Sequence, residues 1–466
     1  MAVTDEERDQ IKQLESELRS TARHDELMLR YYQGRQRVEQ LGMAIPPEMR
    51  KFLVIVNWPR VVVDTIGSRQ QVRSLILPGE ETADPVLQRI WDANNMTAQV
   101  KMFNRDRMIY ARSFMSVFAN DDAPDLPIVR VESPRSMAAL VDIPTETMEC
   151  AGRFFNDRRR RGVRATHMTL LLPDETVYLE RDKNGRWEQV GDRDVHAFGR
   201  VPVVMHLNRR LSGEWCGESQ MVDIIPISDA AARSMTDMQF AQEAHGIPRM
   251  FMTGVSKGEF VDQAGKPIPQ FEAYFDAIHM LTKENAKVGQ LSAADLKNFE
   301  TAIRIYGTQA STVTGFPARY FGMSTTNPPA EGAIRADETQ MVRSIEDQND
   351  EIGMTIGWAG ALAYEFATGT EVQGNLVRAD FFDPATPTVA QREDALSKRR
   401  SMGVLSREGY WDELGWSEAR KAKERQYLAD EAAQDPELAV AQALASGNQP
   451  GIGGVVNGRD DGSVGS

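Results

Sequence analysis

Four consecutive arginines, Arg158, Arg159, Arg160 and Arg161, stand in the segment "NDRRRRGVR". A guanidinium group can bind phosphate oxygens, so a contact with DNA is one hypothesis for this run. A solvated turn between two strands is the plainer explanation, and an ion-pair site between subunits is another. The composition of the segment alone does not choose between them, but we favour the two explanations without DNA.

A second candidate is the segment "GFPARYFG", in which Arg319 and Tyr320 place a cation beside an aromatic ring. An aromatic side chain next to a cation can stack on a nucleic-acid base. Packing of Phe316, Tyr320 and Phe321 against neighbouring structure explains the same pattern without any ligand. We favour packing, and keep Arg319 as a candidate for facing phosphate.

Catalytic motifs are missing from the sequence. It contains no "GxxxxGK[ST]", "HExxH" or "GxSxG" pattern and no cluster of cysteines and histidines. The six histidines are scattered without the spacing of metal ligands, so we expect them to be structural. We therefore predict no catalytic residues, no metal and no cofactor. An enzyme with an unrecognised site is the weakest alternative, and mutation of His206 and Asp223 would test it.

The composition agrees with a non-membrane protein that does not grip nucleic acid tightly. The chain has 466 residues and a net charge of −14, whereas proteins that bind DNA tightly usually present a basic surface. No apolar run reaches the roughly 18 residues of a membrane span. The two cysteines, Cys150 and Cys216, lie far apart, which is typical of a reducing cytoplasmic environment.

The first half of the chain predicts helices followed by β-structure. Apolar spacing predicts a helix over 5–33 that ends at Gly34, and further helices over 84–112. Short β-rich runs between turn residues fill 113–208. Within them, Asn184-Gly185 predicts a hairpin with a type I′ turn.

Two amphipathic helices, over 227–246 and 292–311, bracket a segment rich in glycine and proline at 247–291. Ser292 and Asp295 form the pattern of a capping box for the second helix. The apolar residues of that helix follow a single heptad seam suited to packing against another helix. These residues are Leu296, Phe299, Ile303 and Tyr306.

A long helix is predicted over 329–366, with Pro329 in its first turn. One apolar stripe continues along the whole segment, but its first half is charged around most of its circumference while its second half must be buried. Gly353, Gly357 and Gly360 interrupt the stripe, and we expect a bend or a close contact there. The residues from 388 to 430 predict short helices, and the glycine-rich end predicts disorder.

These segments together resemble the portal proteins of tailed bacteriophages, and look closest to the Gp6-like group found in actinobacteriophages. The resemblance covers about residues 25–430 and depends on the order of several short segments rather than on any one of them. They are "LRYYQGRQRVEQLG", "VNWPRVVVDTIGSR", "RVPVVMHLNRR", "IIPISDAAARSMTDMQ", "TNPPAEGAIRADETQ" and "GVLSREGYWDELGWS".

The resemblance implies an α+β, mainly helical portal-type subunit with a small α/β clip. The implied parts are a wing at 1–226 with a helical N-terminus and a β-rich part at 113–208, stem helices at 227–246 and 292–315, a clip at 247–291, a tunnel loop at 316–328, a long helix and return to the wing at 329–385, a helical crown at 386–430, and a flexible C-terminal tail at 431–466.

The resemblance also implies partners and a function. The subunit would form a homo-oligomeric, dodecameric ring at one capsid vertex of the virion, assembled in the host cytoplasm. The ring would nucleate the capsid with the major capsid and scaffolding proteins, dock the terminase large subunit and the head–tail adaptor, and let double-stranded DNA pass during packaging and ejection. The implied residues of the channel and tunnel loop are Arg319, Tyr320, Thr325, Thr326, Asn327, Pro328, Pro329 and Arg335. A non-viral helical scaffold or adaptor is the main alternative.

Overall fold

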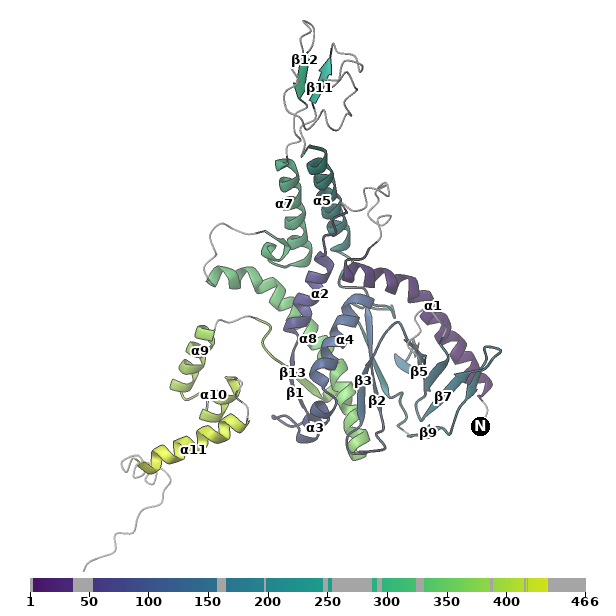
Figure 1. The fold of residues 1–466 in the computed structure, drawn as a ribbon. Helices are drawn as coiled ribbons and strands as arrows, with labels where there is room; N and C mark the ends of the chain where they lie inside the picture. Colours follow the sequence, from purple (N-terminus) through teal and green to yellow (C-terminus); the bar gives the residue numbers. More distant parts are fainter. Residues whose placement is uncertain are drawn as a thin grey trace, which may run out of the picture. The chain divides into compact units, whose positions relative to one another are not determined.

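The computed structural model describes residues 3–36, 53–156, 165–196, 198–245, 250–253, 287–290, 296–323, 331–385, 389–414, 416 and 418–434. The chain divides into two compact units, Met1–Ala385 and Thr386–Ser466. Helices alternate with antiparallel sheets in the first unit, and the described part of the second unit is helical (Figure 1). The predicted α+β, mainly helical class is confirmed.

The helices of the first unit are α1 (Asp5–Gln33), α2 (Trp58–Arg69), α3 (Pro85–Ala93), α4 (Met96–Tyr110), α5 (Ile225–His245), α7 (Lys297–Thr314), η4 (Ala318–Phe321), α8 (Glu331–Thr368) and η5 (Gly374–Leu376). α1 begins with a capping box, in which Thr4 and Glu7 bond each other's main-chain N–H, and ends at Gly34 with φ +64°. Pro59 lies in the first turn of α2, where its missing N–H costs no helical hydrogen bond. The predicted helical region 84–112 is two helices, because Asn95 takes a left-handed conformation between them.

All the strands that the structure describes pair in an antiparallel way. One sheet has the order β10-β2-β3, and a second has the order β4-β5-β6-β7-β8, with β9 also on β7. The strands of these two sheets are β2 (Arg112–Phe118), β3 (Ile128–Glu132), β4 (Met137–Asp142), β5 (Thr147–Phe155), β6 (His167–Leu171), β7 (Glu175–Arg181), β8 (Trp187–Gln189), β9 (Asp194–Val195) and β10 (Val203–Leu207). Two short strand pairs are also described: β1 (Val72–Ile76) with β13 (Arg378–Phe381), and β11 (Met250–Thr253) with β12 (Lys287–Gln290).

The predicted hairpin at Asn184-Gly185 exists between β7 and β8, but its turn type was wrong. A type I′ turn needs positive φ at both central residues, and only Gly185 has it, at +82°. The Gly185 N–H bonds the Asp182 carbonyl at 3.0 Å, and the Asp182 N–H bonds the Arg186 carbonyl at 2.8 Å. This is a three-residue loop with a left-handed glycine, in which the Asp182 carboxylate also accepts the Arg186 N–H.

Two hydrophobic cores meet along α8, which has 38 residues and is therefore about 57 Å long. Its first half buries Met341 and Ile345 with residues of α1, α2, α4 and α5. Its second half buries Ile352 and Ile356 with residues of α3, β1 and β2. A further core lies between α1 and the six-stranded sheet, so α1 covers one face of that sheet (Figure 1).

The glycines in the second half of α8 allow the close contact that the sequence suggested. A Cβ atom at Gly357 would overlap the Val377 carbonyl oxygen and lie 3.0 Å from the Gly374 carbonyl oxygen. A Cβ at Gly353 would lie 3.3 Å from the ring of Phe381. The main chain of η5 and β13 thus packs directly on the second half of α8, at a distance that only glycine permits.

The described part of the second unit contains α9 (Val389–Ser401), α10 (Arg407–Glu413) and α11 (Glu418–Gln434). Ser406 caps α10 by accepting the Gly409 N–H, and Trp411 is buried and stacked on Trp416 with 5.7 Å between ring centroids. The Arg425 guanidinium binds both oxygens of Glu408, at 2.8 and 2.7 Å. The short helices predicted after residue 388 are confirmed. α11 ends at Gln434, so its last four residues lie in the predicted tail, which starts at 431.

Candidate functional site

Arg319 and Tyr320 lie on η4, in a tight turn between α7 and α8. Gly315, with φ +70°, ends α7 and turns the chain, and the Ser311 hydroxyl holds this turn by donating to the Phe316 carbonyl at 2.6 Å. Gly322, with φ +84°, ends η4 in the same way. The two glycines therefore fix where η4 begins and ends.

The aromatic residues of this turn are packed, as we favoured. Phe321 is 3% exposed and meets the Trp58 ring edge-on, with 5.5 Å between centroids. Phe316 is also buried and lies 6.0 Å from the Tyr320 ring. These contacts attach η4 to α2 and leave the Phe316 and Phe321 rings unavailable for stacking on a base.

Polar side chains gather around the carboxylate of Glu338 on α8. We call these five residues the Glu338 cluster: Arg69, Arg319, Tyr320, Asp337 and Glu338. Arg319 forms ion pairs with Asp337, at 2.8 Å, and with Glu338. Arg69 lies 3.4 Å from both Glu338 oxygens and donates to the Tyr320 hydroxyl at 2.9 Å. The Tyr320 hydroxyl donates to Glu338 at 3.2 Å. The cluster thus joins α2, η4 and α8.

Glu338 is ionised at neutral pH in this environment. Burial, with only 8% of the residue exposed, raises the pKa of its carboxyl. The Arg69 and Arg319 guanidinium groups more than offset burial and hold the pKa of Glu338 below its usual range. The Arg319 charge is consequently balanced within the subunit. Arg335, one turn before Glu338, is exposed, and no ion pair is found for it within the described residues.

The other predicted contact residues lie outside the part of the chain that the structure describes. These are Arg158, Arg159, Arg160 and Arg161, and in the tunnel loop Thr325, Thr326, Asn327, Pro328 and Pro329. Their roles stay predictions.

The predicted heptad seam lies mostly where we expected. α5 and α7 pack side by side, and Ile303 and Tyr306 of α7 contact the buried core around Phe316. Phe299 is half-buried. Leu296 precedes the first helical residue, Lys297, and is 39% exposed, so its packing role stays a prediction. The predicted capping pair, Ser292 and Asp295, lies outside the described residues.

A second polar group was not predicted at all, and we call it the Arg107 junction: Gln70, Asn104, Arg107, Asn208 and Gln348. Arg107 on α4 is 1% exposed. It donates to the side-chain oxygens of Asn208, Gln70 at 2.7 Å, Gln348 at 3.1 Å and Asn104 at 3.4 Å. Burial lowers the pKa of Arg107 to about 9, so it remains charged at neutral pH among neutral partners.

Both polar groups had a signal in the sequence that we did not use. Glu338 occupies a position of the apolar stripe of α8, between Ile334 and Met341. Arg107 occupies the buried stripe of α4, seven residues after Val100. A charged residue on a buried stripe needs a partner, which predicts a polar contact even though it does not identify the partner.

The two residues named for the enzyme hypothesis, His206 and Asp223, do not form a catalytic pair. His206 is buried beside the Phe103 ring, and its Nδ1 lies 3.0 Å from the Thr355 hydroxyl. Burial, with a smaller effect of the Arg107 charge, lowers the pKa of His206 to about 3. Asp223 instead accepts from Arg209 at 2.9 Å.

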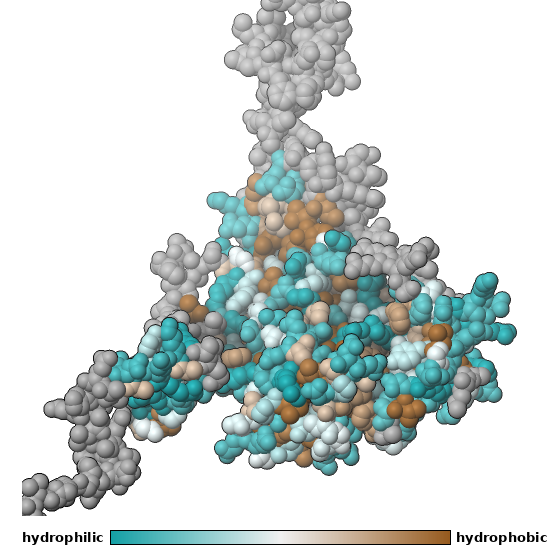
Figure 2. Space-filling model, turned by 60° about the horizontal axis from the view of Figure 1, so that its bottom comes forward, coloured by the Kyte–Doolittle hydropathy of each residue, from teal (hydrophilic) through white to brown (hydrophobic). Residues whose placement is uncertain are grey.

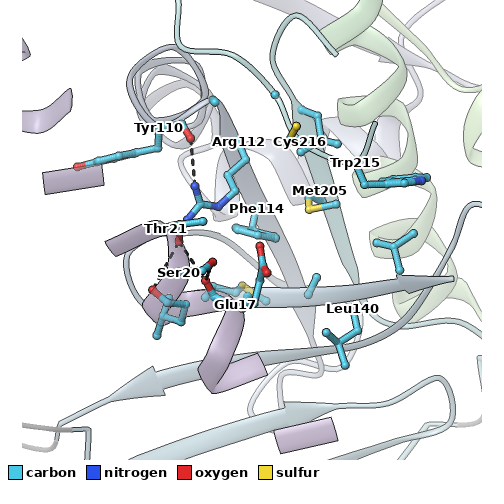
Figure 3. A pocket seen from close by; sticks show the side chains of 18 of the residues that line it. Glu17, Ser20, Thr21, Tyr110, Arg112, Phe114, Leu140, Met205, Trp215 and Cys216 are labelled. Carbon is cyan, nitrogen blue, oxygen red and sulfur yellow. Dashed lines mark hydrogen bonds between the residues drawn. The ribbon is translucent and has the colours of Figure 1, made fainter. Parts of the chain in front are cut away.

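A pocket of about 430 Å³ lies between α1 and the strands β2, β4 and β10 (Figure 3). Arg112 points into it, but its guanidinium is already bound to Asp25 at 2.8 Å, Thr21 at 2.8 Å and the Tyr110 carbonyl at 3.1 Å. Among its described lining residues, no hydrogen bond joins a nucleophile to a base. The pocket therefore has neither a free cation for an anionic ligand nor a catalytic arrangement.

Within the described residues, no group of three or more histidine, cysteine, aspartate or glutamate side chains is arranged to hold a metal ion. No helix in the same part of the chain combines the length and apolar character of a membrane span.

The order of the described helices and strands agrees with the portal-type subunit that the resemblance implied. Residues 11–437 match the family model described as "Phage portal protein, SPP1 Gp6-like", and the chain belongs to this family. It is 31% identical over 434 residues to the portal protein of Mycobacterium phage D29, covering 90% of this chain and 88% of that protein. The portal protein of Mycobacterium phage L5 is likewise 31% identical, over 432 residues, with the same coverage. The predicted resemblance is confirmed.

Solved structures of two gene transfer agent particles also align with the chain. The neck of a native particle, computed with C12 symmetry, gives a TM-score of 0.43 at 12% identity, covering 80% of this chain and 94% of that one. The virion of a native particle gives a TM-score of 0.42 at 13% identity with the same coverage. These scores are too low to define the fold of this chain.

Proposed function

We propose that the chain forms a homo-oligomeric ring, a dodecamer, at one vertex of a phage capsid, and that double-stranded DNA passes through this ring. The observation that carries the proposal is the family match over residues 11–437. In this proposal the ring nucleates capsid assembly with the major capsid and scaffolding proteins. It then docks the terminase large subunit during packaging and the head–tail adaptor afterwards, and it assembles in the host cytoplasm.

The parts of the subunit take the roles that the resemblance implied. α5 and α7 are the stem helices, and the region between them, which contains β11 and β12, is the clip that faces the terminase. The tunnel loop at 316–328 includes η4, and α8 supports it. The acidic balance of the chain, −14 overall, agrees with a channel that must not hold a moving duplex by its phosphates. Because the ring only conducts DNA, we propose that it performs no catalysis itself.

The exposed surface of the stem supports packing between subunits. Ile305 is 55% exposed and Val313 is 47% exposed on α7. Figure 2 shows hydrophobic residues gathered on the α5–α7 pair. Apolar side chains in such a place are typical of a protein interface. In the proposed ring they contact the stem of the neighbouring subunit.

Electron microscopy of the purified chain in negative stain tests the ring. Rings with a central hole are expected, and a species that stays monomeric at high concentration would contradict the proposal. Ile305→Asp should reduce the fraction of rings at least tenfold, because a charge in an apolar interface remains without a partner. Ile305→Val is the matched control and should leave ring formation unchanged.

DNA passage is tested separately through the tunnel loop. Pro329→Gly is expected to loosen the loop and reduce the yield of packaged DNA, while ring formation stays intact. Of the two arginines near the loop, Arg335 is the better candidate for facing phosphate, because Arg319 already pairs with two carboxylates. If loss of phosphate contact is what matters, Arg335→Gln should therefore change the yield of packaged DNA more than Arg319→Gln.

A further inference from the structure

We propose that Glu338 is the positioning residue for η4: its single carboxylate holds two arginines from different elements and thereby fixes η4 between α2 and α8. Arg69 comes from the last turn of α2, and Arg319 comes from η4 itself. Neither arginine lies three or four residues from Glu338 in the sequence: Arg69 is 269 residues away and Arg319 is 19 residues away. The contact is therefore a tertiary one that only the folded subunit makes.

The balance of charge shows why this carboxylate matters more than its neighbour. Arg69 and Arg319 carry two positive charges, and Asp337 and Glu338 carry two negative charges, so the Glu338 cluster is neutral. Asp337 contacts Arg319 only and is 53% exposed in its side chain, whereas the Glu338 side chain is 10% exposed and contacts both arginines. Without the Glu338 charge, two guanidinium groups would face each other in a site where water screens them poorly.

The cluster also reaches the end of the first unit. Arg69 donates from Nη1 to the Pro384 carbonyl at 3.1 Å, while its Nη2 donates to the Tyr320 hydroxyl at 2.9 Å. One guanidinium thus ties η4 to the chain that leaves β13. If Glu338 releases Arg69, both connections weaken together.

This inference rests on the proposed function in one respect, namely that η4 belongs to the tunnel loop of a DNA channel. In that case, the orientation of η4 determines where the loop lies in each subunit. A ring in which this position varies between subunits should package DNA less efficiently. The ring can still assemble, because the side chains of Arg69 and Glu338 are only 15% and 10% exposed and do not belong to the exposed apolar surface of Ile305 and Val313.

Hydrogen exchange of the purified chain tests the positioning role without any reference to DNA. In Glu338→Gln, the amides of Tyr320, Gly322 and Met323, which bond to carbonyls within the same turn, should exchange about tenfold faster. Amides of β2 and β10 should be unchanged. The matched control is Glu346→Gln, on the exposed face of the same helix, which should alter neither set.

A second variant tests whether Glu338 acts through Arg69. Arg69→Gln removes the donor to Glu338, to the Tyr320 hydroxyl and to the Pro384 carbonyl, so it should also speed exchange in η4. In Glu338→Gln combined with Arg69→Gln, the increase should be smaller than the product of the two single effects, because the two residues share these bonds. Exchange that is unchanged in Glu338→Gln, or single effects that multiply in full, would overturn the positioning role.

The yield of packaged DNA in virions that carry each variant then tests the role in the channel. We expect Glu338→Gln to form rings normally and to reduce packaging about tenfold, whereas Glu346→Gln should leave packaging unchanged. Faster exchange combined with normal packaging would overturn the role of η4 in DNA passage while leaving the ring intact. Absence of rings in the wild-type protein would instead contradict the proposed function.

Discussion

The two halves of α8 are attached to the subunit by different kinds of contact. In the first half only one stripe is buried, at Glu338, Met341, Ile345 and Asn349, and an ion-pair cluster occupies one of its positions. In the second half nearly every side of the helix is buried, from Ile352 to Ala363. There the glycines bring the main chain of another segment into direct contact with the helix.

The difference indicates how one helix can serve both a core and a moving substrate. Close packing of backbone on backbone has a single geometry and resists change. An ion-pair cluster near the surface contributes less and can exchange partners. We therefore expect substitutions in the second half to change the stability of the whole subunit, and substitutions in the first half to change mainly the local order of η4.

The largest effect is expected for Gly357→Ala. The new methyl group would overlap the Val377 carbonyl oxygen, so the η5 segment or the helix must move, and the loss of stability should be about 3 kcal/mol or more. Urea denaturation of the purified chain measures it. Gly332→Ala, in the first half, meets nothing within 4 Å and should not destabilise the protein. Equal losses from the two variants would contradict the comparison.

Arg107→Met should have the next largest effect. It leaves the amide oxygens of Gln70, Asn208 and Gln348 without their buried donor, which should cost about 3 kcal/mol in the free energy of unfolding. Arg105→Met, on the exposed face of the same helix, is the control and should stay within about 0.5 kcal/mol of wild type. A neutral result for Arg107→Met would show that the junction adds nothing beyond apolar packing.

His206 makes the stability of the second half sensitive to acid. Its pKa is lowered to about 3 in the folded protein, against about 6.5 in an unfolded chain, so below pH 6.5 the unfolded state binds a proton that the folded state does not. Stability should therefore fall by about 2 kcal/mol between pH 7 and pH 5 on this account. Burial raises the pKa of Asp106 to about 7, which acts in the opposite direction over this range, so the loss is measured as the difference between wild type and His206→Phe at both pH values. His24→Gln, at an exposed position, should retain it.

The sequence predicted the elements well where the signal is local. Apolar periodicity and Gly34 identified α1, and the order of several short segments identified the portal family. The turn type predicted at Asn184 was wrong, because Asn-Gly is compatible with more than one kind of hairpin loop. The loop length decides which kind forms. No local pattern could pair Arg69 with Glu338, because a contact across 269 residues depends on the assembled fold.

The smallest effect is expected for Tyr320→Phe, which removes one hydroxyl from the Glu338 cluster and keeps the ring that packs near Phe316. The hydroxyl accepts from Arg69 and donates to Glu338, at 2.9 and 3.2 Å. Its loss should cost about 1 kcal/mol. In a double-mutant cycle with Glu338→Gln, the two losses should not add, because the two residues share these bonds. Strict additivity would mean that Tyr320 acts through packing alone, and that the ion pairs of Glu338 hold η4 without it.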